Sequence, residues 1–281
     1  MSNTSASSGA RDSPVPRFAA FVVSDRDNGT SRRRSKWFII AGMVRKAVSP
    51  QKSSRRRRIS QILEGLDRRF PDAKCALEHR TAFELLIATI LSAQCTDERV
   101  NIVTRDLFQK YPGPQAFAAA PPRELEQDIR STGFYRNKTK SIQGACRMIL
   151  ERFGGKAPET MQELIELPGV ARKTANVVLG VAYGKAEGIV VDTHVTRVSR
   201  RLELTKETVP EKIERDLMTV IPQSRWILFS HQMILHGRHI CKARRPLCHQ
   251  CPVEPVCRSK DKVTAFPPSK TAARAGRKQR G

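Results

Sequence analysis

Apolar residues recur every three to four positions through most of residues 59–236, which is the spacing of amphipathic helices. The first such stretch begins at Ile59, passes through Leu66 and ends at Pro71. The same spacing predicts further helices at about 83–91, 97–111, 122–129, 136–153, 160–167, 171–183, 192–202, 213–221 and 226–236. About ten helices without any alternating strand pattern predict an all-α fold.

The composition fits a globular body flanked by basic arms. Apolar residues make up 39% of the 281 residues, which is enough to form a core. The formal net charge is +24, which predicts a polyanionic partner. Residues 31–58 hold +11 of this charge and residues 258–281 hold +7, which leaves +6 for residues 59–257. We therefore expect residues 1–58 and 258–281 to be disordered basic extensions, with a transit peptide as the alternative for 31–58.

No stretch of the sequence predicts a membrane partner. The longest apolar run near the start, Trp37 to Val44, has eight residues. A membrane-spanning helix needs roughly 20.

Four cysteines lie close together after the last predicted helix. Cys241, Cys248, Cys251 and Cys257 form a C-x6-C-x2-C-x5-C run. Four thiolates suit a soft-ligand site for zinc or iron–sulfur. Structural zinc usually takes two C-x2-C pairs and only one is present, so the spacing favours a 4Fe–4S cluster.

The loop between the first two of these cysteines is cationic. It contains Lys242, Arg244 and Arg245. A loop fixed at both ends by a metal centre holds such cations in place, so we expect these three residues to contact phosphates.

Residues 167–175 read LPGVARKTA and predict a helix, a tight Pro-Gly turn and a second helix. The backbone N–H groups of Gly169, Val170, Ala171 and Arg172 then lie at a turn and a helix start, where intrahelical acceptors are missing. Such groups, together with the helix dipole, can bind a phosphate whatever the base sequence. A plain helix–helix connection is the alternative, and the adjacent Arg172-Lys173 pair favours the phosphate site.

An apolar run ends in Val191-Asp192-Thr193-His194, at the start of a predicted helix. A carboxylate in this position is more often a helix N-cap than a catalytic group. The sequence around Asp192 does not by itself indicate a catalytic role.

Several separate segments together resemble the bacterial endonuclease III family, which are helix-hairpin-helix DNA glycosylases with an iron–sulfur cluster. The resemblance covers residues 59–257 and rests on LSAQCTD at 91–97, GFYRNK at 133–138, the hairpin at 167–175, VDTH at 191–194, LHGR at 235–238 and the four cysteines. It implies two helical lobes with a DNA cleft between them. One would be a six-helix barrel at 75–187, and the other would join 59–74 to 188–257 and hold one 4Fe–4S cluster.

The resemblance also implies roles for individual residues. Lys173 matches the family's nucleophile, and Asp192 matches its catalytic carboxylate. Gln94 matches the residue that fills the gap left by an extruded base, and Phe134 stands where the family inserts an apolar wedge. Ala171 replaces a glycine common in the family, so a positive φ there would be mildly strained.

The implied function is a bifunctional DNA glycosylase and abasic-site lyase that removes oxidised pyrimidines from double-stranded DNA. A monofunctional adenine-excising mismatch glycosylase is disfavoured because Lys173 is present and only a short tail follows Cys257. A non-catalytic iron–sulfur DNA-binding protein would predict a broken Lys–Asp pair, whereas both residues are intact. We expect a monomer in the bacterial cytoplasm, associated with the nucleoid.

Overall fold

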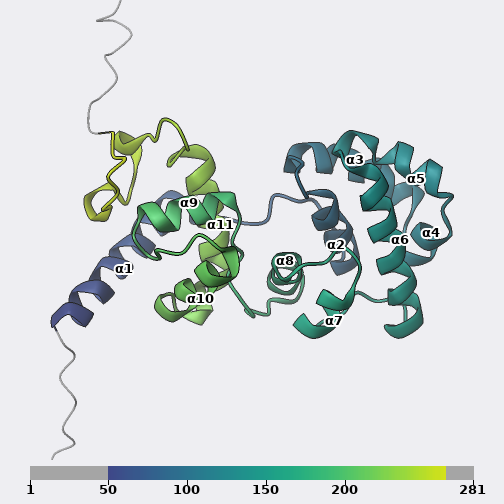
Figure 1. Cartoon of the computed structure of the whole chain (residues 1–281), viewed down its shortest axis with the longest axis horizontal. Coiled ribbons are helices and arrows are strands. Elements are labelled where there is room, and N and C mark those ends of the chain that lie inside the picture. Colours follow the sequence, from purple (N-terminus) through teal and green to yellow (C-terminus); the bar gives the residue numbers. More distant parts are fainter. Residues whose placement is uncertain (1–49, 264–281) are drawn as a thin grey trace, which may run out of the picture. The chain divides into compact units, whose positions relative to one another are not determined.

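A computed structural model of the chain describes residues 50–263 (Figure 1). These residues form only helices and turns, without any strand, which confirms the all-α prediction. The α-helices are α1 (Pro50–Arg69), α2 (Ala82–Leu91), α3 (Asp97–Lys110), α4 (Pro114–Ala119), α5 (Pro122–Asp128), α6 (Tyr135–Arg152), α7 (Met161–Glu166), α8 (Arg172–Tyr183), α9 (Thr193–Arg201), α10 (Pro210–Val220) and α11 (Trp226–His239). The short 3-10 helices are η1 (Arg130–Thr132), η2 (Gln223–Arg225), η3 (Cys248–Gln250) and η4 (Glu254–Val256).

Side-chain caps fix where several of these helices begin. In each case a hydroxyl or carboxylate accepts a hydrogen bond from the N–H three residues further on, which satisfies a donor that the helix cannot. The capping residues are Thr81 for α2, Thr96 for α3, Thr160 for α7 and Asp192 for α9. The start of α9 therefore depends on the carboxylate that the sequence singled out.

The helices from α2 to α8 surround one hydrophobic core. Its buried residues run from Leu77 to Leu179. α2 lies at the centre, since every residue from Phe83 to Leu91 is buried. α6 packs against α4 and α5, and α8 packs against α2 and α7.

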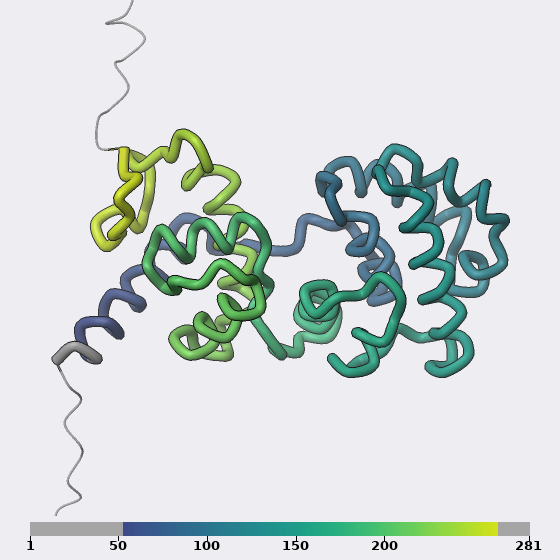
Figure 2. Tube along the Cα trace, in the orientation of Figure 1, coloured from purple at the N-terminus to yellow at the C-terminus, as the bar shows by residue number. Residues whose placement is uncertain are grey.

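A second core combines the start of the described region with its end. It contains Ile59 to Leu66 of α1 together with buried residues from Ile189 to Val253. Figure 2 shows the chain passing from α1 into α2–α8 and then into α9–α11. Gly65 permits close packing of α1, because a Cβ there would lie 2.7 Å from Cγ1 of Val253. The segment that follows the last α-helix is thus held against the first one.

The start of one helix and the presence of another differ from the predictions. α1 begins at Pro50, so residues 50–58, expected to be disordered, are helical. Arginine is a good helix former, and Nη1 of Arg58 donates to the carbonyl oxygens of Leu202 (2.9 Å) and Val256 (3.3 Å). The short helix α4 was not predicted. The remaining parts of the two basic extensions, 1–49 and 264–281, lie outside the described residues.

The first residues of the expected basic tail also make contacts. Lys262 Nζ lies 2.7 Å from Oε1 of Glu254, and Nε of Arg201 lies 3.3 Å from Oδ2 of Asp261. Residues 258–263 are therefore attached to α9 and η4. Among the helices of residues 50–263, none has the length and apolarity needed to cross a bilayer.

Candidate functional site

One pocket gathers side chains from segments that are far apart in the sequence. It has a volume of about 280 Å³ and is lined by the turn after α2, the start of α8, the segment before α9 and part of α11. Gln94, Lys173, Asp192 and Arg238 are among its lining residues. The structure thus brings four of the predicted site residues together, since Ala171 also lines this cavity, which we call the Lys173 pocket.

Lys173 is the second residue of α8, and its side chain is exposed. The position lies in the first turn of the helix, where the backbone dipole contributes positive potential. The hairpin turn before it leaves the N–H groups of Gly169 and Ala171 without an acceptor in the described region, whereas Val170 donates to the carbonyl of Leu167 (3.0 Å). The amides available to a ligand are therefore fewer than the sequence predicted.

The two small residues of the hairpin have different backbone conformations. Gly169 has φ +79°, and a Cβ there would lie 2.6 Å from Cβ of Ser141, so this position requires glycine. Ala171 has φ −90° and ψ 168°, which is extended backbone that any residue adopts. The strain considered for Ala171 is absent, because this residue is the N-cap of α8 and not a left-handed turn position.

Asp192 is half-buried at the start of α9. Its Oδ1 accepts a hydrogen bond from the N–H of Val195 at 2.8 Å. The N-cap role that the sequence made the commoner alternative is therefore present. The same side chain also lines the Lys173 pocket, so one carboxylate occupies both positions.

Arg172 makes an internal ion pair. Its Nε and Nη2 donate to the two carboxylate oxygens of Glu214 at 2.9 and 3.1 Å, and Asn176 donates to one of them at 2.9 Å. The Glu214 side chain is only 7% exposed. The guanidinium thus joins α8 to α10, and contact between Arg172 and DNA remains a prediction.

Gln94 and Phe134 share an unusual backbone conformation. Gln94 has φ +54° and Phe134 has φ +48°, in the left-handed region that residues other than glycine rarely adopt. Both side chains are exposed, and Phe134 is 60% exposed. Gln94 lines the Lys173 pocket, whereas Phe134 lies beside a separate shallow pocket with Tyr135 and Arg136.

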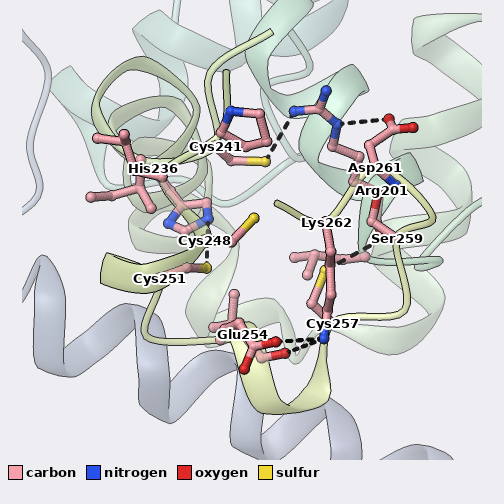
Figure 3. A pocket seen from close by; sticks show the side chains of 15 residues that line it. Arg201, His236, Cys241, Cys248, Cys251, Glu254, Cys257, Ser259, Asp261 and Lys262 are labelled. Atoms are coloured by element: carbon pink, nitrogen blue, oxygen red, sulfur yellow. Dashed lines mark hydrogen bonds and ion pairs between the residues drawn. The ribbon is translucent and has the colours of Figure 1, made fainter. Parts of the chain in front are cut away.

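The four cysteines of the C-x6-C-x2-C-x5-C run line a second pocket (Figure 3). All four are free thiols. Arg201 Nη1 lies 3.5 Å from Sγ of Cys241, and Nε2 of the buried His236 lies 3.7 Å from Sγ of Cys251. In residues 50–263, no group of three or more histidine, cysteine or acidic residues is placed to hold a single metal ion. We call this cavity the cysteine pocket.

The cationic loop between Cys241 and Cys248 lies on the surface. Lys242, Arg244 and Arg245 are exposed. Arg201 fixes the start of this loop, since its guanidinium donates to the carbonyl oxygens of Lys242 (2.7 Å) and Ala243 (2.8 Å). The cations therefore project from a backbone that is tied to α9.

Comparison with known sequences identifies the family. Residues 87–223 match the family described as HhH-GPD superfamily base excision DNA repair protein. Endonuclease III of Synechocystis sp. is 56% identical over 207 residues, which cover 74% of this chain and 94% of that protein. The chain belongs to the endonuclease III family.

Solved structures of endonuclease III have the same fold. A non-covalent endonuclease III–DNA complex aligns with a TM-score of 0.69 at 48% identity, over 72% of this chain and 95% of that one. A trapped endonuclease III–DNA covalent intermediate, described as an estranged-adenine complex, aligns with the same TM-score at 49% identity and the same coverage.

The endonuclease III motif LHGR at 235–238 combines three contacts that the sequence alone did not show. His236 lies against the cysteine pocket. Gly237 permits close packing of α11 on α9, because a Cβ there would lie 2.7 Å from Cβ of His194. Arg238 Nη2 donates to Oδ2 of Asp97 at 2.6 Å, which ties α11 to the start of α3.

Sequence reasoning also missed Lys138 and Glu214, which are both buried. A signal for Glu214 exists, since it shares a face of α10 with the apolar residues Ile213 and Leu217. Lys138 is part of the GFYRNK motif, but its partners are distant in sequence, so no local pattern identifies them.

Proposed function

We propose that this chain is a bifunctional DNA glycosylase and abasic-site lyase of base excision repair, acting on oxidised pyrimidines in double-stranded DNA. The observation that carries the proposal is that Lys173 and Asp192, which are 19 positions apart in the sequence, line one pocket at a helix N-terminus. A duplex hides the sugar C1′ atom, so the damaged nucleotide must be extruded into this pocket first.

Lys173 is the nucleophile of the proposed reaction. Its neutral amine attacks C1′, the glycosidic bond breaks, and the base leaves with the bonding electron pair and takes up a proton. Ring opening then gives an iminium between Nζ and C1′. The iminium acidifies the C2′ protons, and loss of one of them expels the 3′ phosphate, so the strand is cut 3′ to the lesion.

Asp192 stabilises the positive charge that develops on the sugar and assists proton transfer. Its N-cap bond to Val195 supports this role, because the bond holds Oδ1 in place and keeps the carboxylate beside the pocket. Preorganised charges need little rearrangement when the reaction occurs, and this makes their effect on the barrier large.

The hairpin and the two left-handed turns would bind the DNA. The N–H groups of Gly169 and Ala171, with those of the first turn of α8, would bind a phosphate, which would give affinity without base preference. Val170 and Arg172 are the other two hairpin residues that we expect to contact the DNA. Gln94 would occupy the gap left by the extruded base, and Phe134 would enter the stack as an apolar wedge.

The cysteine pocket fits a 4Fe–4S cluster. Four free thiols line one cavity (Figure 3), and a 4Fe–4S cubane takes one thiolate for each of its irons. When bound, the cluster would tie together the loop that presents Lys242, Arg244 and Arg245 to phosphates.

We further propose that the chain works as a monomer in the bacterial cytoplasm, at the nucleoid. The bacterial relatives that share this DNA repair family, such as endonuclease III of Synechocystis sp., support this location.

Borohydride trapping tests the proposed function. Duplex DNA with one thymine glycol is incubated with the wild type and with Lys173→Gln in the presence of borohydride, which reduces an iminium to a stable amine. We expect a covalent protein–DNA complex with the wild type and none with the variant. Lys185→Gln is the matched control, because Lys185 lies after α8 and pairs with Glu159, and this variant should trap as the wild type does.

The other outcomes distinguish the alternatives. Base release by the wild type without a trapped complex would indicate a monofunctional glycosylase. Binding to the duplex with neither trapping nor release would indicate a non-catalytic DNA-binding protein. Trapping by Lys173→Gln would mean that another residue is the nucleophile.

A further inference from the structure

A buried ammonium group links the two turns that present Gln94 and Phe134. Lys138 lies in the second turn of α6 and is 5% exposed. Its Nζ donates to the carbonyl oxygen of Leu91 at 2.7 Å and to that of Thr132 at 2.8 Å. Both acceptors are neutral, so no carboxylate compensates the charge, and burial lowers the pKa of Lys138. An uncompensated cation in a core is unfavourable unless its hydrogen bonds are well formed.

Both carbonyl groups lie at helix ends. Leu91 is the last residue of α2, and Thr132 is the last residue of η1. Carbonyl groups at a helix C-terminus lack an intrahelical donor and form the negative end of the helix dipole. One ammonium therefore caps two helix ends, from a third helix, α6, that contacts both α2 and η1. Figure 1 shows α6 beside α2.

Each capped end leads directly into a strained turn. Gln94 follows Leu91 by three residues, and Phe134 follows Thr132 by two. Among the described residues, only Gln94, Phe134 and Glu203 combine a side chain with positive φ. Strained backbone of this kind persists only where the surrounding structure holds it. Lys138 is the side chain that contacts the chain just before both turns.

We propose that Lys138 is a positioning residue that fixes the Gln94 and Phe134 turns relative to each other, so that both side chains enter the duplex together when the damaged base is extruded. This rests on the proposed function, since it assigns the two side chains to DNA distortion. Without the ammonium, each carbonyl lacks a donor and each turn can relax toward ordinary φ. Extrusion then suffers more than the chemistry on a sugar that is already displaced.

The test compares two DNA substrates under single-turnover conditions. The first is a duplex with a paired thymine glycol, which requires extrusion. The second is a preformed abasic site in a single-nucleotide bulge, which has no opposing base and leaves no gap to fill. Lys138→Met keeps the length and the burial of the side chain but removes both hydrogen bonds. Lys140→Met is the matched control, because Lys140 is an exposed lysine on the same helix.

We expect Lys138→Met to lower thymine glycol excision by roughly tenfold or more, because it leaves two buried acceptors unsatisfied, and to change strand cleavage at the bulge by less than about twofold. The fluorescence rise of a 2-aminopurine beside the lesion, which reports unstacking, should fall in parallel. Lys140→Met should match the wild type in all three measurements.

Three results would overturn the proposal. An equal loss on both substrates would make Lys138 a purely structural residue. Equal rates for Lys138→Met and the wild type would show that the turns do not depend on it. Loss of excision with an unchanged 2-aminopurine signal would place its effect after extrusion. Failure of the wild type to cleave either substrate would instead contradict the proposed function, so the two failures are distinguishable.

Discussion

The Lys173 pocket and the cysteine pocket are built in different ways. The four thiols of the cysteine pocket come from one short segment, residues 241–257. The Lys173 pocket takes Gln94, Lys173, Asp192 and Arg238 from four separate parts of the chain. The residues of the first are set by local spacing, whereas the second exists only when both hydrophobic cores are formed.

This difference predicts how each pocket responds to change. With the proposed cluster bound, the cysteine pocket would depend on each of its four thiols. The Lys173 pocket depends on the chemical groups that line it and also on remote contacts that set their positions, such as the Arg172–Glu214 ion pair. Substitutions near and far from the chemistry can therefore separate the two cases.

The largest effect is expected for Asp192→Asn. Asparagine caps a helix as well as aspartate does, so stability should be unchanged, while removal of the charge should lower the single-turnover excision rate by about 10²–10⁴-fold. Asp192→Ala should add a loss of about 1 kcal/mol in the free energy of unfolding. If Asp192→Asn excised at the wild-type rate, the carboxylate would be only a cap.

Cys251→Ser should destabilise the protein by about 4 kcal/mol or more, as expected for loss of a structural metal centre. It should also abolish visible iron–sulfur absorption and weaken DNA binding, because the loop with Lys242 is then released. Thermal unfolding, absorption spectra and DNA titration measure these effects. Cys146→Ala is the control, since Cys146 is buried in the other core and should leave the absorption intact.

Arg172→Met tests the remote support of the Lys173 pocket. It leaves the carboxylate of Glu214 buried without its cation, which should cost about 3 kcal/mol, the lower end of the range for such pairs, because the Arg172 side chain is 45% exposed. Urea unfolding measures the cost. Adding Glu214→Leu should recover most of this stability. If Arg172→Met alone were as stable as the wild type, the ion pair would not stabilise the packing of α8 against α10.

The smallest effects are expected at the hairpin, where two small residues provide a matched pair. Gly169→Ala should destabilise by about 2 kcal/mol, because φ is +79° and the new Cβ would meet Ser141. Ala171→Gly should change stability by less than about 0.5 kcal/mol, since a better N-cap offsets the greater freedom of the unfolded chain. A large gain in stability from Ala171→Gly would imply strain that its φ of −90° does not indicate.

Most of the fold could be predicted from the sequence because the helices have strong apolar periodicity and clear caps. α4 was missed because six residues that follow a Pro-Gly pair are too few to show a periodic pattern. The start of α1 was missed because a run of arginines resembles a solvated arm. Its helical state depends on contacts with Leu202 and Val256, which lie more than 140 positions away.

The candidate site was predictable to the extent that its chemistry is local. The cysteine run and the hairpin can be read from short segments, and the structure gathers each into one place. The partners of Lys138 and Arg238, in contrast, are backbone and carboxylate oxygens from other helices. Long-range pairs of this kind leave no trace in spacing, and the backbone angles of Gln94 and Phe134 leave none either.

The Arg58 guanidinium also limits how far this protein can be shortened from its N-terminal end. It donates to three carbonyl groups, those of Leu202, Glu203 and Val256, and so fastens α1 to the ends of α9 and η4. A truncated chain that starts at residue 59 would lose this fastening, although sequence composition alone recommends that cut. A chain that starts at residue 50 would keep it, so the boundary between basic arm and catalytic body lies before α1, inside the stretch that charge alone assigns to the arm.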